Sequence, residues 1–268
     1  MEPTSPMLEK PSITVAPFRL DLFSSMMSKS FIAADIGLLL LMNLPIILMI
    51  APGNTPFMRP RVIVNCAMSP DGKIAGTERR QLRISSPEDM ERVRELRSQC
   101  QAILVGAGTI LADDPHLTVR GLPRDAQALR VVLDPRGKVP ETALVLDGRA
   151  STLMVTTEDC ARTYPGAEVA RLGRGAIDLG ALLNLLERRG VSSLLVEGGG
   201  ETIYSFFRWG LVDVYSVFVG DFVIGGREAP TPVDGEGFRT GEHVPLRLVS
   251  VERLGGGVHL TYEVRRDG

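Results

Sequence analysis

The chain has 268 residues, of which 44% are hydrophobic and 23% are charged, and its formal net charge is −2. This length allows one large α/β core, and the near-neutral charge excludes the basic surface that nucleic-acid binding requires. The three cysteines form no CxxC pair and the three histidines have no zinc-ligand spacing, so we expect no metal site, no disulfide framework and a reducing, cytoplasmic location.

The first 57 residues differ in composition from the rest. Their apolar run, Ile36–Ile50, is shorter than the roughly 20 residues that a membrane-spanning helix needs, and its upstream flank lacks the concentrated positive charge of a signal peptide. We interpret residues 1–57 as a leader that is disordered or that precedes a natural start at Met58. A membrane anchor is the alternative interpretation. Residues 58–268 are predicted to form a single domain.

Strands and helices alternate from Arg61 onward. The run Arg61–Ala67 predicts the first strand, and Ser86-Pro87-Glu88-Asp89 has the N-cap, the proline and the acidic first turn of a helix start. Further short strands are expected at 102–105, 130–133, 152–155 and 193–196, and further helices after Asp178 and from Glu201. This order predicts a mainly parallel central sheet with helices on both faces.

The C-terminal part changes character. Residues 213–219 alternate like a strand, a loop rich in glycine and proline runs from 225 to 245, and two strands flank Gly255-Gly256-Gly257 as a hairpin. We expect these elements to add an antiparallel edge to the parallel sheet.

Two glycine-marked turns carry most of the functional information. One is Gly106-Ala107-Gly108-Thr109 and the other is Gly198-Gly199-Gly200-Glu201-Thr202, and each follows an apolar strand and precedes a segment that can form a helix. Such turns direct free backbone N–H groups at one point, which suits phosphate. Two in one domain suggest a dinucleotide. The Rossmann fingerprint is absent, because the third glycine of GxGxxG is missing.

Longer segments extend these turns. Residues 65–75, 105–120 and 195–200 resemble the reductase family of riboflavin biosynthesis, which includes the C-terminal domain of the bacterial bifunctional deaminase-reductases. Residues 224–231 and 233–238 are similar to the archaeal branch, the 2,5-diamino-6-(ribosylamino)-4(3H)-pyrimidinone 5′-phosphate reductases. The H-x-E and P-C-x-x-C signatures of the zinc deaminase are not in the sequence. We therefore expect a reductase that acts before deamination.

The resemblance implies a dihydrofolate-reductase-like α/β fold, a homodimer and NADPH as cofactor, with NADH as the alternative. The implied reaction reduces the ribosylamino side chain of the pyrimidinone phosphate to the ribitylamino form. Hydride reaches C1′ of the imine that forms when the sugar ring opens. A reductase of the same fold for another pteridine or pyrimidine, and a non-catalytic nucleotide-binding module, are the alternatives. No nucleic acid or membrane partner is expected.

Site residues follow from the same resemblance. Those implied to bind the cofactor are Ala67, Gly106, Thr109, Asp113, Gly198, Gly199, Gly200, Glu201, Thr202, Ile203 and Tyr204. Arg97, His116 and Arg120 are implied to hold the substrate phosphate, which forked guanidinium groups suit. Glu197 and Asn65, at the ends of two strands, are the implied catalytic positions, and Glu197 is expected to contact and orient the substrate.

Overall fold

The computed structural model describes residues 59–80 and 82–266, and the leader 1–57 lies outside them. In chain order the elements are β1 (Arg61–Met68), α3 (Pro87–Gln99), β2 (Ala102–Gly106), α4 (Ala107–Asp113), η1 (Arg124–Ala126), β3 (Leu129–Leu133), η2 (Leu144–Leu146), β4 (Thr152–Thr156), β5 (Glu168–Arg171), α5 (Leu179–Arg188), β6 (Ser193–Val196), α6 (Gly200–Arg208), β7 (Val214–Val219), β8 (Leu246–Leu254) and β9 (Gly257–Val264). None of the helices within this described part combines the length and apolar character needed to cross a bilayer.

The strands form one sheet in the order β5-β4-β3-β2-β6-β1-β7-β9-β8. Neighbours from β5 to β7 run parallel, whereas β9 and β8 are antiparallel. The predicted parallel sheet with an antiparallel C-terminal edge is therefore confirmed. Strand β5 was not predicted, because it is a short edge strand with no fully buried residue and so has no continuous apolar run.

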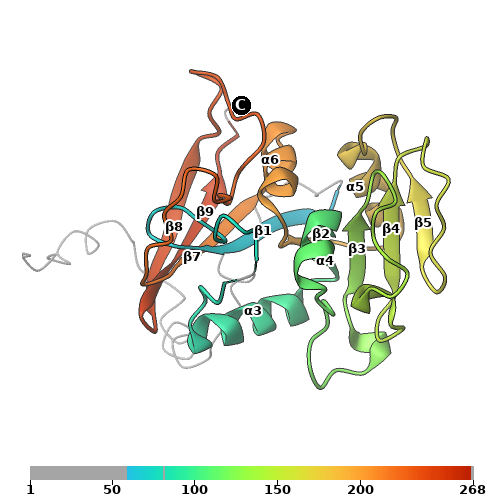
Figure 1. Ribbon diagram of the computed structural model, residues 1–268, viewed down its shortest axis with the longest axis horizontal. Helices are drawn as coiled ribbons and strands as arrows, with labels where there is room; N and C mark the ends of the chain where they lie inside the picture. Colours follow the sequence, from blue (N-terminus) through green and yellow to red (C-terminus); the bar gives the residue numbers. More distant parts are fainter. Residues whose placement is uncertain (1–58, 81, 267–268) are drawn as a thin grey trace, which may run out of the picture. The chain divides into compact units, whose positions relative to one another are not determined.

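Helices cover both faces of the sheet (Figure 1). On one face, α5 and α6 pack leucines and phenylalanines against alternate residues of the central strands, such as Val64 and Val196. On the other face, Leu96 of α3 and Ile110 of α4 pack against the intervening residues Ile63 and Leu195. This alternation determines which side chains share a face.

The predicted helix starts are also confirmed. The Ser86 hydroxyl accepts a hydrogen bond from Asp89 N at 3.2 Å, and Pro87 is at the first helical position of α3. The Asp178 carboxylate accepts from Ala181 N at 2.8 Å at the start of α5. In both cases the side chain satisfies a backbone donor that has no partner within the helix.

A buried polar network connects α3 to the sheet. Arg92 on α3 donates from Nε to Asp89 Oδ1 (2.8 Å), from Nη1 to Ser216 Oγ (3.1 Å) and from Nη2 to Asn65 Oδ1 (2.9 Å). Ser216 on β7 also lies 2.9 Å from Nε2 of His259 on β9. Burial, together with the nearby Arg92 charge, lowers the pKa of His259 to about 4. The His259 imidazole is therefore neutral at pH 7.

The lowered pKa predicts a specific loss of stability in acid. Below about pH 6.5, His259 takes up a proton in the unfolded chain but not in the folded protein until about pH 4. Its contribution to stability is complete above pH 6.5 and is lost as the pH falls to 4. Across this range we expect the unfolding free energy of the wild type to fall more than that of His259→Gln, by up to about 3 kcal/mol.

Urea denaturation at a series of pH values measures this difference. His243→Gln is the matched control, because His243 is exposed on a loop, whereas His259 is buried in the network. Parallel stability curves for the wild type and His259→Gln would contradict the prediction.

Candidate active site

The two glycine turns are in direct contact. They follow β2 and β6, which are neighbouring parallel strands. A Cβ atom on Gly106 would lie 2.5 Å from Thr202 Oγ1, and a Cβ atom on Gly198 would lie 2.8 Å from Thr109 Oγ1. Each turn thus places a threonine hydroxyl where the other turn has no side chain. Glycine at both positions is required by this close approach rather than by backbone conformation.

Free backbone donors lie at the second turn. Gly199, the N-cap of α6, has a φ of 71°, in the left-handed region that favours glycine, and provides no side-chain acceptor for the first turn of the helix. The first N–H groups of α6 are consequently available to an anion. Gly200 has a different role, because a Cβ atom there would lie 2.5 Å from the carbonyl oxygen of Thr231.

Asp113, at the C-terminal end of α4, has an unsatisfied carboxylate. Its Oδ1 is buried without a hydrogen-bond partner among the described residues, and burial raises the pKa of this carboxyl group. A buried carboxylate oxygen without a donor is costly in a folded protein. The arrangement suits a ligand that brings a hydroxyl group to this point.

Three predicted site residues lie together on the α3 face. Val64 pairs with Val196, the last residue of β6, so Asn65 and Glu197 each come one residue after this pair. Asn65 is not at the end of its strand as predicted, because β1 continues to Met68 by pairing with β7. Both carboxylate oxygens of Glu197 accept from Arg97 Nε, at 2.9 and 3.1 Å. Glu197 is only 8% exposed, and its charge raises the pKa of Arg97. The ion pair uses only Nε of Arg97. Nη1 and Nη2 bond no described residue and are therefore available to an anion.

Two other predicted phosphate ligands lie elsewhere. His116 Nδ1 is 2.9 Å from Asp147 Oδ2, and Asp147 also accepts from the fully buried Arg130 at 3.0 Å. Arg120 is exposed and has no ion pair within the described ranges. Neither residue bonds Arg97 or Glu197. Their roles toward substrate stay predictions.

The remaining predicted cofactor residues differ in position. Ile203 is buried in the core and its N–H bonds Gly199 O. Tyr204 donates to Gly237 O at 2.9 Å and its ring lies 5.3 Å from that of Phe238. Glu201 is exposed, and Ala67 is half-buried near the end of β1.

Contacts made by the 221–245 loop were not apparent from the sequence. Asp71 accepts from Ile224 N and Gly225 N, and Lys73 donates to Ala229 O at 2.9 Å. Asp234 N then bonds Gly200 O at 3.2 Å. Asp71 and Lys73 thus hold a loop that lies 153 to 156 residues away in the chain. No periodic pattern could have indicated these partners.

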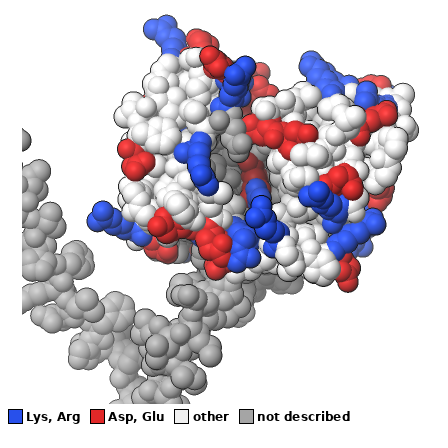
Figure 2. Space-filling model, turned by 60° about the horizontal axis from the view of Figure 1, so that its bottom comes forward, with Lys and Arg blue, Asp and Glu red and all other residues white. Residues whose placement is uncertain are grey.

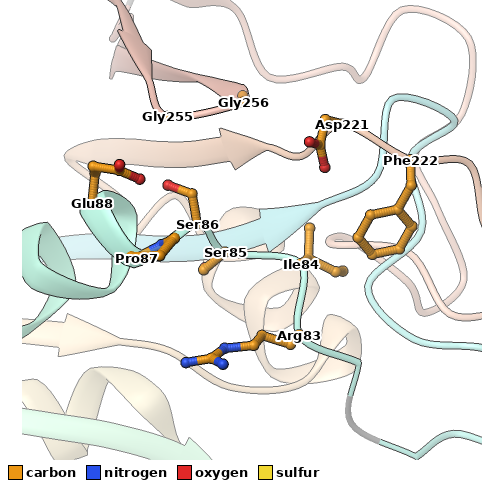
Figure 3. A pocket seen from close by; sticks show the side chains of 11 residues that line it. Arg83, Ile84, Ser85, Ser86, Pro87, Glu88, Asp221, Phe222, Gly255 and Gly256 are labelled. Carbon is orange, nitrogen blue, oxygen red and sulfur yellow. The ribbon is translucent and has the colours of Figure 1, made fainter.

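The protein surface on the α3 side has a furrow with acidic and basic side chains on both of its banks (Figure 2). A hollow of about 370 Å³ lies at the N-terminal end of α3 (Figure 3). Arg97 does not line it and is in the last turn of the helix. The lining of the hollow includes Glu88, Asp221 and the glycine turn between β8 and β9. A Cβ atom on Gly256 would lie 2.5 Å from Asp221 Oδ2, which explains a glycine there.

Comparison with known proteins decides the family. Residues 60–260 match the model of the RibD C-terminal domain. The chain belongs to this family. Two similar proteins are named 2,5-diamino-6-ribosylamino-4(3H)-pyrimidinone 5′-phosphate reductase: one from Archaeoglobus fulgidus, 42% identical, and one from Methanothermobacter thermautotrophicus, 40% identical. In both comparisons the match covers 78% of this chain and 100% of the relative.

A solved structure supports the same assignment. The Thermotoga maritima diaminohydroxyphosphoribosylaminopyrimidine deaminase/5-amino-6-(5-phosphoribosylamino)uracil reductase superposes with a TM-score of 0.68 at 27% identity. The match covers 77% of this chain and 57% of that protein, so the chain spans little more than half of its length. The predicted dihydrofolate-reductase-like fold of this RibD C-terminal domain protein is confirmed.

The contact between the two turns predicts the effect of filling Gly106. Gly106→Ala is expected to destabilise the protein by about 1–3 kcal/mol, because the new methyl group overlaps Thr202 Oγ1 while the backbone itself tolerates alanine. Thermal denaturation measures the effect, and the double variant Gly106→Ala/Thr202→Ala should recover part of it.

Gly108→Ala is the matched control, since a Cβ atom on Gly108 meets nothing within 4 Å and alanine favours the helix by up to about 1 kcal/mol. Equal stability of the two single alanine variants would disprove the proposed contact.

Proposed function

We propose that this protein reduces the ribosylamino side chain of 2,5-diamino-6-(ribosylamino)-4(3H)-pyrimidinone 5′-phosphate to the ribitylamino form in riboflavin biosynthesis. The observation that carries the proposal is the Arg97–Glu197 pair, in which Glu197 directly follows β6 and directly precedes the second of the two joined glycine turns. The two archaeal relatives with this named activity match over their whole length, which supports the same substrate here.

The residues present fit a nicotinamide dinucleotide. The uncapped start of α6 suits the pyrophosphate, and the orphaned Oδ1 of Asp113 suits a ribose hydroxyl. Thr109 and Thr202 pack against the opposite glycines and so keep the two turns together. When bound, the reduced nicotinamide supplies the hydride. NADPH is the proposed form, and NADH is the alternative that a direct comparison of the two cofactors tests.

The substrate-side residues have separable tasks. Arg97 presents Nη1 and Nη2 to the 5′-phosphate, and Glu197 holds that guanidinium through Nε. Glu197 and the amide of Asn65 also lie where hydroxyl groups of the opened sugar can bond them. Reduction adds hydride to C1′ and a proton to the imine nitrogen. Orienting the opened chain between these groups brings C1′ toward the transferable hydride.

A homodimer and a cytoplasmic location complete the proposal. The edge strand β8 exposes Leu246, Leu248, Val249 and Val251, with Val251 58% exposed. An apolar edge of this kind is a liability in a monomer and typical of an interface. Cys66, Cys100 and Cys160 are free thiols, as a reducing compartment allows. Burial raises the pKa of Cys66 to about 11, so this thiol is protonated at neutral pH.

The activity predicts NADPH oxidation with the pyrimidinone riboside phosphate. Loss of NADPH absorbance should accompany formation of the ribitylamino product, identified by mass spectrometry. The dephosphorylated riboside should react poorly, because Arg97 then has no phosphate to bind. Purified protein that binds NADPH but turns over only a different pteridine or pyrimidine would replace this substrate assignment.

Arg97→Gln tests the phosphate contact. We expect kcat/KM to fall about 30- to 100-fold, mainly through KM, because a charge-assisted contact of about 2–3 kcal/mol is lost. Arg94→Gln is the matched control, since Arg94 is on the same helix and pairs with the exposed Glu91. Steady-state kinetics with both variants measure the difference. A fall of equal size in the control would contradict the assigned role.

The dimer prediction concerns β8. Val251→Glu should convert a dimer to monomers in size-exclusion chromatography with light scattering, because it places a charge in the apolar interface. Val223→Glu is the control, since Val223 is 72% exposed outside β8. A wild-type protein that is monomeric at all concentrations would refute the dimer.

A further inference from the structure

Arg92 is a buried cation close to the proposed site whose function the reaction does not explain. Its side chain is 7% exposed, and its charge is balanced by Asp89, whose side chain is 1% exposed. A salt bridge desolvated to this degree contributes little net stability compared with apolar packing. Nη1 bonds Ser216 Oγ on β7, and Nη2, which also lies 2.7 Å from Asp89 Oδ1, bonds Asn65 Oδ1 on β1.

The contacts of Arg92 determine which way the Asn65 amide faces. A guanidinium group only donates, so the Asn65 atom 2.9 Å from Nη2 is the carbonyl oxygen. The Ser216 hydroxyl donates to the same oxygen at 3.1 Å, and in that arrangement His259 donates from Nε2 to Ser216. With its oxygen held by two donors, Asn65 can offer a ligand only its Nδ2 hydrogens. Nδ2 bonds no residue of the described ranges.

The amide is held next to the acidic member of the site. Asn65 and Glu197 each follow by one residue the last β1–β6 pair, Val64 with Val196, and both side chains are on the α3 face. Helix α3 therefore contributes twice: Arg92 orients Asn65, and Arg97, five residues later, pairs with Glu197. A donor amide and an acceptor carboxylate are thereby placed side by side by one helix.

We propose that Arg92 is a positioning residue, which holds the Asn65 carbonyl so that the Asn65 NH₂ group faces the substrate as a hydrogen-bond donor. This inference rests on the proposed function, since it assigns Asn65 a contact in that reaction. Ser216 also holds the Asn65 carbonyl oxygen, by donating a hydrogen bond to it. Neither Arg92 nor Ser216 touches the substrate, and both act only through Asn65.

A kinetic double-mutant cycle tests the proposal. Arg92→Lys keeps the charge beside Asp89 but loses the fork that reaches Asn65 and Ser216. It should lower kcat/KM about tenfold in the wild-type background and less than twofold in an Asn65→Ala background. The fall in melting temperature should also be smaller in the Asn65→Ala background, because Arg92 and Asn65 are hydrogen-bonded to each other. Arg94→Lys, on the exposed side of α3, should change neither quantity. An equal loss of kcat/KM in both backgrounds would show a purely structural role.

An NMR measurement keeps the inference independent of the substrate assignment. The side-chain NH₂ signal of Asn65, identified by its loss in Asn65→Asp, should show an ordered amide in the wild type and in Arg94→Lys. It should become mobile in Arg92→Lys and in Ser216→Ala, the latter serving if the lysine variant fails to fold. An unchanged amide in both variants overturns the inference. An inactive wild type with the expected amide behaviour overturns the proposed function alone.

Discussion

The reciprocal contact between Gly106 and Thr202, and between Gly198 and Thr109, is the constraint on which the site depends. It requires that β2 and β6 be neighbours and that both turns keep glycine where the other turn's hydroxyl lies. Because β2 and β6 are parallel, their C-terminal ends lie on the same side of the sheet. The next strand, β1, adds Asn65 on this same side. One local packing requirement thus sets the positions of the anion-binding turn and of the polar cluster together.

The polar groups beneath α3 form a second layer of organisation. Asp89, Arg92, Asn65, Ser216 and His259 are all buried and come from one helix and three strands. Such a network is costly unless its members are paired, which restricts the helix to one position on the sheet. The same helix carries Arg97 at its C-terminal end. The position of the phosphate-binding group is therefore linked to the orientation of the Asn65 amide.

The loop 221–245 connects segments that are far apart in the sequence. It is held at one end by Asp71 and Lys73 and reaches Gly200 at the start of α6. Tyr204, on the first turns of α6, packs against the same loop. The glycine at position 200 and the aromatic ring at 204 are explained by this packing. Motif reasoning alone assigned both residues to a ligand.

Local patterns in the sequence determined the parallel sheet, the helix starts at Ser86 and Asp178, the C-terminal hairpin and the two glycine turns. These features depend on capping side chains, apolar periodicity and glycine, which act over a few residues. Strand β5, the partners of Asp71 and the burial of Ile203 depend on which segments pack together. The Arg97–Glu197 pair and the Arg92 network likewise join residues up to 151 positions apart in the chain. Only the tertiary structure decided these contacts, because strand order and register bring their partners together and no short-range pattern encodes either.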